Sequence, residues 1–283
     1  MKFSYSMPPE ELVLNNTSLK FVESGVKWWL TDPRWKQAAS EITACILNPG
    51  SIDPDKILKH SERRLVFQYF AADTGHTFVV KAFPLSLLRH RLKHQKYAYS
   101  EAKHLLIAKN KGLQVPEVYG YGLRKKLGLV LFNVVLMQYV DHFSLIDFLR
   151  LKNANECMEI LKQRVSPLFI KMYHAGVNHI DCDPSAIFLS KNDALEDMLI
   201  DFQYVSFYQG KSVQTLAAQL GYFTWSVRGQ YKFLSRKDLR QWFEYTINSA
   251  GHECNDLLWE IYEENSYKLR SIKQRLAGYE LDL

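Results

Sequence analysis

The stretch His174–Ser190, HAGVNHIDCDPSAIFLS, places two aspartates, Asp181 and Asp183, in a short polar loop between two apolar segments. The residues before this loop have apolar side chains at helical spacing, and Gly176 is well placed to end that helix. The residues after it, AIFLS, form a short apolar run that is typical of a buried strand. Catalytic and binding side chains concentrate in loops of this kind. The stretch therefore predicts a functional loop that carries two carboxylates.

A third carboxylate follows at a similar place in the next element. The segment DMLIDFQ puts Asp201 directly after another short apolar run. Two short strands, each with an acidic residue at its edge, would bring Asp181 and Asp201 to one place. Phosphoryl transfer requires one carboxylate that accepts or orients the proton of the acceptor hydroxyl, and another that holds Mg²⁺ on the phosphates. We therefore take Asp181 as the candidate base and Asp201 as a candidate Mg²⁺ ligand.

Two further charged residues stand among apolar neighbours earlier in the chain. Lys81 lies inside the strand-like run FVVKAF, and Glu101 follows 20 residues later in a segment with helical apolar spacing. Taken alone, each fits a side chain that reaches solvent. A lysine tethered by a glutamate, however, can contact the α and β phosphates of ATP. The ordered series Lys81, Glu101, Asp181 and Asp201 therefore favours an ATP-dependent phosphotransferase.

The apolar patterns divide the chain into a β-rich half and a helical half. We predict a β-hairpin over residues 64–83 with Gly75 in its turn, and a buried strand pair at Leu127–Met137. Helical spacing predominates from Ser144 onward. The fold class predicted is α+β with two lobes: an N-terminal extension packed on the small lobe (1–55), a small β-rich lobe (56–139) and a larger helical lobe (140–283).

Composition narrows the function classes. The 283 residues carry 36 basic and 30 acidic side chains, a net charge of +6 spread along the chain, so no nucleic-acid partner is expected. Four cysteines without a CxxC pair argue against a zinc site or a disulfide framework. We find no secretory signal and no apolar run near the roughly 18 to 20 residues that span a bilayer. We expect a cytoplasmic protein whose membrane contact, if any, is peripheral.

Over roughly residues 56 to 235 the chain resembles the protein-kinase-like superfamily. Within it, the chain is similar to the bacterial lipopolysaccharide core kinases, which act on heptose and Kdo. The resemblance rests on five segments: SERRLVFQYF before the lysine strand, LLRHRLKH after it, SEAKHLLIAKNKGLQVPEVYGYG, HIDCD and LIDFQ. It implies a protein-kinase-like two-lobed fold, the cofactors ATP and Mg²⁺, and a lipid-linked sugar of the lipopolysaccharide core as acceptor, met at the cytoplasmic face of the inner membrane.

The resemblance also implies roles for six residues. According to the resemblance, a turn that contains arginine replaces the glycine-rich loop that usually covers the ATP phosphates. The implied roles are as follows: Lys81 contacts ATP phosphates, Glu101 pairs with Lys81, Asp181 is the catalytic base, Asp201 binds Mg²⁺, and Arg63 or Arg64 lies near the phosphates.

The chain departs from the kinase pattern in its catalytic loop. Ala186 stands where kinase-like loops carry a metal-binding Asn, and it offers no ligand. Asp183 is our candidate for a second carboxylate on the metal, directly or through water. Gln203 replaces the glycine of the DFG triplet. We expect His179 to brace the backbone rather than to take part in the chemistry.

Two alternatives remain open from the sequence. One is another phosphotransferase of the same fold, which acts on a small alcohol, an aminoglycoside or a protein. The other is a non-catalytic pseudokinase that serves as a binding module, which Ala186 and the missing glycine-rich loop favour. The retention of all four charged residues favours catalysis. The sequence leaves open which sugar hydroxyl is modified, the number of metal ions and the oligomeric state.

Overall fold

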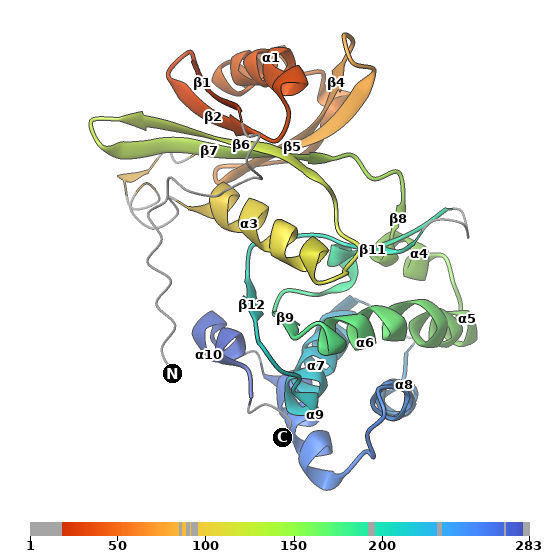
Figure 1. The fold of residues 1–283 in the computed structure, drawn as a ribbon. Helices are drawn as coiled ribbons and strands as arrows, with labels where there is room; N and C mark the ends of the chain where they lie inside the picture. The colour runs from red at the N-terminus through yellow and green to blue at the C-terminus, as the bar shows by residue number, and fades with distance from the viewer. Residues whose placement is uncertain are drawn as a thin grey trace. The chain divides into compact units, whose positions relative to one another are not determined.

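The computed structural model describes residues 19–84, 87–88, 91, 96–191, 196–230, 234–268 and 270–279. They form two compact units, which we describe separately. The sheet unit comprises the described residues of Met1–Leu106 together with Pro116–Val140, and the helical unit those of Ile107–Val115 together with Asp141–Leu283. The predicted order, a β-rich part followed by a helical part, is confirmed (Figure 1).

The sheet unit is built on a seven-stranded antiparallel sheet with strand order β1-β2-β6-β7-β5-β4-β3. Its strands are β1 (Leu19–Glu23), β2 (Val26–Leu30), β3 (Ile57–Ser61), β4 (Arg64–Ala71), β5 (His76–Pro84), β6 (Val118–Lys126) and β7 (Leu129–Gln138). The predicted hairpin is β4–β5, with Gly75 at φ 66° in its turn. A glycine adopts such a positive φ without steric cost.

The prediction of a strand pair at Leu127–Met137 is wrong. Leu127 and Gly128, both with positive φ, form the turn after β6, and the rest of the run is the single strand β7. This strand lies between β6 and β5 in the sheet, and most of its residues are buried. A central strand covered on both faces reads as a continuous apolar run, which explains why the run has no internal break.

Residues 19–47, whose role the sequence left unassigned, form part of the sheet unit: two strands of the sheet and a helix that packs on it. β1 and β2 extend it at one edge, and helix α1 (Lys36–Leu47) contributes Ile42 to the core that Trp28 and Trp35 share. The indole Nε1 of Trp28 donates to Thr43 Oγ1 of α1 at 3.0 Å. Figure 1 shows α1 against one face of the sheet and α3 (Tyr97–Asn110) against the other.

The helical unit packs around a buried aromatic core that includes Phe169, Phe223 and Trp242. Its helices are α4 (Leu145–Arg150), α5 (Ala154–Ile160), α6 (Ser166–His174), α7 (Val213–Gln230), α8 (Arg236–Ser249), α9 (Asp256–Tyr267) and α10 (Ile272–Ala277). A π-helical turn, Leu161–Val165, joins α5 to α6. None of the helices in the described residues combines the length and the apolar character that a membrane-spanning segment needs.

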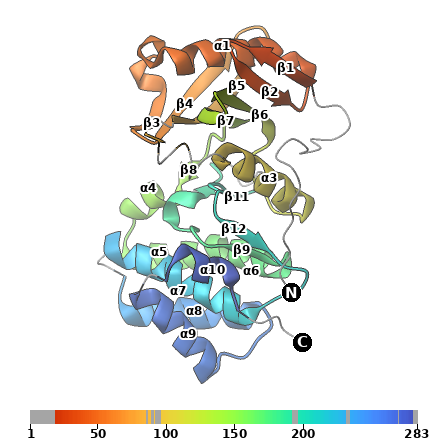
Figure 2. The same ribbon diagram turned by 90° about the vertical axis from the view of Figure 1, so that its left-hand side faces the viewer.

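Short strands position the loops that carry the carboxylates. β9 (Val177–His179) pairs with β12 (Val205–Phe207), and β10 (Ile187–Leu189) pairs with β8 (Phe143–Ser144) and β11 (Met198–Leu199). Asp201 follows β11, as the apolar run before it predicted. Asp181 follows β9, a strand that the sequence pattern did not predict, and precedes the predicted strand β10. In Figure 2 these strands lie in the helical unit.

Candidate active site

Lys81 and Glu101 form a buried ion pair inside the sheet unit. The Lys81 Nζ lies 2.7 Å from Glu101 Oε1, and the two side chains are only 7% and 1% exposed. The neighbours of Lys81 on β5, such as Val80 and Ala82, are fully buried. A buried charge that loses its partner is strongly destabilising. The sheet therefore holds an ammonium group whose position is fixed by a carboxylate on the adjacent helix.

The elements that carry this pair are themselves anchored. β5 is bonded on both sides, with Lys81 opposite Val66 of β4 and Val135 of β7. α3 is tied to β7 near its start, because the backbone N–H of Ala98 donates to Asn133 Oδ1 at 2.9 Å. The pair is thus located by the sheet register and by a polar contact at the helix N-terminus.

The arginines predicted near the phosphates lie at the β3–β4 hairpin. Arg63 is exposed in the turn, and Arg64 begins β4 with its guanidinium carbon 5.7 Å from the centroid of the Phe83 ring. Their role at the phosphates stays a prediction. Most of the basic run at residues 87–94 lies outside the described residues.

His179 links the two carboxylate loops in the helical unit. Its ring is fully buried, and Nε2 donates to the carbonyl oxygen of Ile200, the residue before Asp201, at 2.9 Å. A carbonyl oxygen only accepts, so this contact requires the Nε2–H tautomer. The ring also packs edge-on against Phe202 at 4.7 Å between centroids. The prediction that His179 braces the backbone is confirmed.

Three carboxylates of these loops act on the protonation of His179. Burial lowers the pKa of His179, while the fields of Asp201, Asp181 and Asp183 act in the opposite direction. Burial raises the pKa of Asp181, which Arg275 and His179 counteract and Asp201 reinforces. A carboxylate whose basicity is raised by burial is suited to accept a proton.

Two observations bear on Mg²⁺ binding. Asp201 has φ 64°, a left-handed conformation that costs a non-glycine residue about 1 kcal/mol and is found in turns and at functional sites. No three His, Cys, Asp or Glu side chains among the described residues converge as a metal site by themselves. Mg²⁺ needs only one or two carboxylates when phosphates and water complete its shell. Asp201, with Asp183 as a second donor, fits that requirement.

Asp183 already has a structural role. Its Oδ1 accepts from the backbone N–H and the hydroxyl of Ser185, at 2.7 and 2.6 Å, and so caps the turn Pro184–Ala186. Ala186 is buried in this turn and offers no ligand. The capping contact leaves Asp183 Oδ2 as the oxygen for any metal role.

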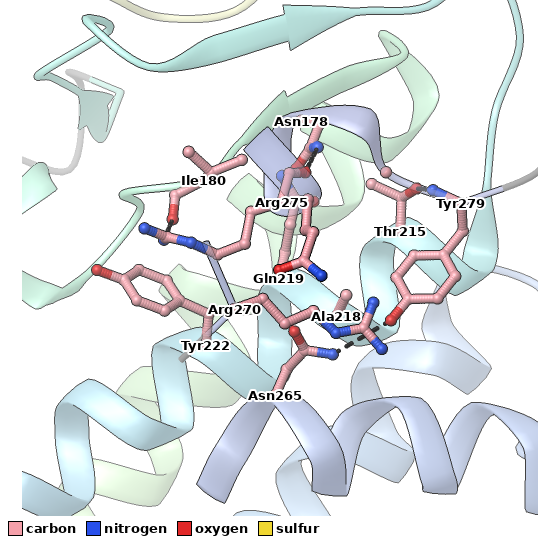
Figure 3. A pocket seen from close by; sticks show the side chains of 12 residues that line it. Asn178, Ile180, Thr215, Ala218, Gln219, Tyr222, Asn265, Arg270, Arg275 and Tyr279 are labelled. Atoms are coloured by element: carbon pink, nitrogen blue, oxygen red, sulfur yellow. Dashed lines mark hydrogen bonds between the residues drawn. The ribbon is translucent and has the colours of Figure 1, made fainter. Parts of the chain in front are cut away.

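Sequence analysis missed a cation at Asp181. Arg275 Nη1, on α10, donates to Asp181 Oδ1 at 3.2 Å and to the carbonyl oxygen of Ile180 at 2.5 Å. The guanidinium carbon lies 4.7 Å from the centroid of the Tyr222 ring. Figure 3 shows Arg275, Ile180 and Tyr222 among the residues around a cavity of about 20 Å³, which is room for a water molecule. The contact joins residues 94 positions apart, and no local pattern in the sequence indicates it.

Part of the chain matches a known protein family. Residues 79–206, which contain Lys81, Glu101, Asp181 and Asp201, match the family model "Lipopolysaccharide kinase (Kdo/WaaP) family". Among solved structures, the chain is similar to one described as WaaP in complex with acyl carrier protein. That likeness has a TM-score of 0.51 and 16% identity, and it covers 74% of this chain and 82% of the other. The comparison with curated proteins finds no match.

The structural likeness, at this level of identity, concerns the fold alone: a protein-kinase-like arrangement of an antiparallel sheet followed by helices. It confirms the predicted fold class. Together with the family match it also confirms the predicted resemblance: over residues 79–206 the chain is similar to the lipopolysaccharide kinase (Kdo/WaaP) family.

Proposed function

We propose that this protein transfers the γ-phosphoryl group of ATP, with Mg²⁺, to a sugar hydroxyl of the lipopolysaccharide inner core, on heptose or Kdo. Membership in a kinase family implies phosphoryl transfer and the use of ATP. The observation that carries the proposal is the buried Lys81–Glu101 pair, at 2.7 Å. Apolar residues of similar size would be as stable at these positions, so a fold with no nucleotide to bind would have no physical need of the pair.

Each of these residues would have a separate role in an in-line phosphoryl transfer. Lys81 would contact the α and β phosphates, held in place by Glu101, and Arg63 or Arg64 would add charge near the phosphates. Asp181 would accept the proton of the acceptor hydroxyl as its oxygen bonds to the γ-phosphorus and ADP leaves. Mg²⁺, held by Asp201 and Asp183, would neutralise charge on the phosphate oxygens.

The nature of the acceptor sets the proposed location. A lipid-linked core sugar is met at a membrane surface, so we place the protein in the cytoplasm with peripheral contact at the inner membrane. Its net charge of +6 favours an anionic acceptor and anionic headgroups.

A second candidate is a non-catalytic module of the same fold that binds a nucleotide or a partner without turnover. It is favoured by the catalytic loop, where Ala186 replaces a ligand and Asp183 Oδ1 is engaged by Ser185. ATP binding without transfer to any acceptor would distinguish this candidate from a kinase.

The test is transfer of labelled γ-phosphate from Mg-ATP to a panel of acceptors: heptose- and Kdo-containing inner core, a simple alcohol, an aminoglycoside and a protein. Asp181→Asn removes the base, and Asp141→Asn is the matched control, because Asp141 is an exposed aspartate paired with Lys191. We expect label on the core sugar with the wild type and the control, and its loss by at least about 10²-fold with Asp181→Asn. Label on another acceptor alone, or on none, would refute the proposed acceptor.

A further inference from the structure

Helix α10 is fixed to the strands of the helical unit by hydrogen bonds to the carbonyls of its last turn. The carbonyl of Arg275 accepts from Asn178 Nδ2 of β9 at 2.7 Å. The carbonyl of Leu276 accepts from Ser206 Oγ of β12 at 2.8 Å and from Tyr208 Oη at 3.2 Å. None of the residues in α10 is buried. Directional polar contacts, rather than apolar burial, therefore set the position of this helix.

The segment after α10 is held as closely. Gly278 ends the helix with φ 65°, and a Cβ at this position would collide with the Tyr208 hydroxyl. The backbone N–H of Tyr279 then donates to Thr215 Oγ1 of α7 at 3.0 Å. These anchors, at Arg275 itself and over the four residues that follow it, leave Arg275 little freedom along the chain.

The side chain of Arg275 uses one nitrogen for two contacts with the catalytic loop. Nη1 carries two protons, and its two acceptors are Asp181 Oδ1 and the carbonyl oxygen of Ile180. The side chain is 10% exposed and the guanidinium lies over the Tyr222 ring. A planar guanidinium held in this way restricts the position of the carboxylate oxygen that it contacts.

Arg275 thus makes hydrogen bonds to the segment 178–181 at two places. Its carbonyl oxygen accepts from Asn178, and its guanidinium donates to Ile180 and Asp181. The loop 180–186, IDCDPSA, has no lysine or arginine of its own that could do this. We propose that Arg275 is the positioning residue for Asp181, so that the C-terminal helix completes the catalytic loop. This inference rests on the proposed function.

The geometry gives the two oxygens of Asp181 separate tasks. Oδ1 is engaged by Arg275, which leaves Oδ2 to accept the proton when the acceptor oxygen bonds to phosphorus. The proton then passes from Asp181 to solvent after ADP has left. A misplacement of a reacting group by about 1 Å lowers turnover about 10²-fold. Loss of Arg275 should therefore lower kcat and leave the KM for ATP unchanged.

The experiment compares Arg275→Met, Arg275→Lys and the matched control Arg270→Met. Arg270 lies on the same segment but pairs with Glu264 and packs on Tyr279. We expect kcat to fall about 10²-fold in Arg275→Met and to recover in part in Arg275→Lys, which restores a charge but only one donor nitrogen. Arg270→Met should retain wild-type kcat. Arg270→Met should unfold at the denaturant concentration of the wild type to within the effect of a surface substitution. The two Arg275 variants should unfold at a slightly lower concentration, because a nearly buried, hydrogen-bonded side chain is changed.

Hydrogen exchange separates this inference from the proposed function. The amides of Cys182 and Asp183 should exchange faster in Arg275→Met than in the wild type, and at the wild-type rate in Arg270→Met. Unchanged exchange overturns the inference, as does wild-type kcat in Arg275→Met or an equal loss of kcat in Arg270→Met. A wild-type protein that phosphorylates no acceptor refutes the proposed function, and the exchange rates still decide whether Arg275 holds the loop.

Discussion

Two ion pairs, one in each unit, are built in opposite ways. Lys81–Glu101 lies in the sheet unit, joins residues 20 positions apart and is almost fully buried, with exposures of 7% and 1%. Arg275–Asp181 lies in the helical unit, joins residues 94 positions apart and leaves Asp181 33% exposed. A buried ion pair holds its charged groups in fixed positions. A partly exposed ion pair leaves the second carboxylate oxygen accessible, so that it can accept a proton. The difference is consistent with the roles proposed above, a phosphate-binding cation for Lys81 and a base for Asp181.

The largest effect on stability should come from breaking the buried Lys81–Glu101 pair. Lys81→Met leaves Glu101 charged in an apolar site, so we expect the free energy of unfolding to fall by about 3–5 kcal/mol. Arg275→Met should cost far less, because water reaches Asp181. Denaturant unfolding of the two variants measures the contrast directly.

A double variant shows whether the pair stabilises the fold or serves binding. Lys81→Met with Glu101→Leu removes both charges, so most of the lost stability should return while phosphoryl transfer stays absent. A double variant that transfers phosphate at the wild-type rate would exclude Lys81 from the proposed site.

The contrast also separates what the sequence could predict from what it could not. The β4–β5 hairpin and α3 follow from local patterns: alternation around Gly75, and helical spacing that ends near Gly112. Lys81 and Glu101 stood out because each interrupts such a pattern. The register that brings them to 2.7 Å is then a consequence of the sheet and its covering helix.

The two misses have different causes. Leu127 adopts φ 49° in the β6–β7 turn, and leucine carries no signal for that conformation, so the turn was placed wrongly. Arg275 lies on a short helix whose position depends on Asn178, Ser206 and Tyr208. These contacts exist only after the strands have paired, and no single segment of the sequence encodes them.

The next largest effect on stability should come from Gly278, which ends helix α10. Gly278→Ala places a methyl group against the Tyr208 hydroxyl at φ 65°, so the helix end must shift. We expect a loss of about 1–3 kcal/mol in unfolding free energy and a fall in kcat that approaches that of Arg275→Met.

Gly251→Ala is the matched control for that substitution. Gly251 has φ 89° but no atom within 4 Å of the added Cβ, so only backbone strain applies and kcat should be unchanged. An equal loss of kcat in both glycine variants would contradict a specific role for α10.

A smaller effect concerns pH. Burial holds the pKa of His179 below its ordinary value of 6.5, so the folded state binds fewer protons than the unfolded state in acid. The stability that neutral His179 contributes is complete above pH 6.5 and declines as the pH falls toward the folded-state pKa. The decline from this residue approaches about 1.4 kcal/mol per pH unit. His179→Gln, which keeps a donor for Ile200, should show a shallower decline in unfolding free energy measured from pH 7 to 5.

The smallest effect on stability should come from Asp183, where two variants separate its two roles. Asp183→Asn keeps an oxygen that accepts from Ser185, so the turn Pro184–Ala186 should retain its stability. Asp183→Ala removes the acceptor and should cost about 1 kcal/mol. If the carboxylate also serves Mg²⁺, both variants should require more Mg²⁺ for half-maximal transfer, because neither carries the negative charge. A Mg²⁺ requirement that is unchanged in both, with stability lowered only in Asp183→Ala, would limit Asp183 to capping and leave Asp201 as the carboxylate proposed for the metal.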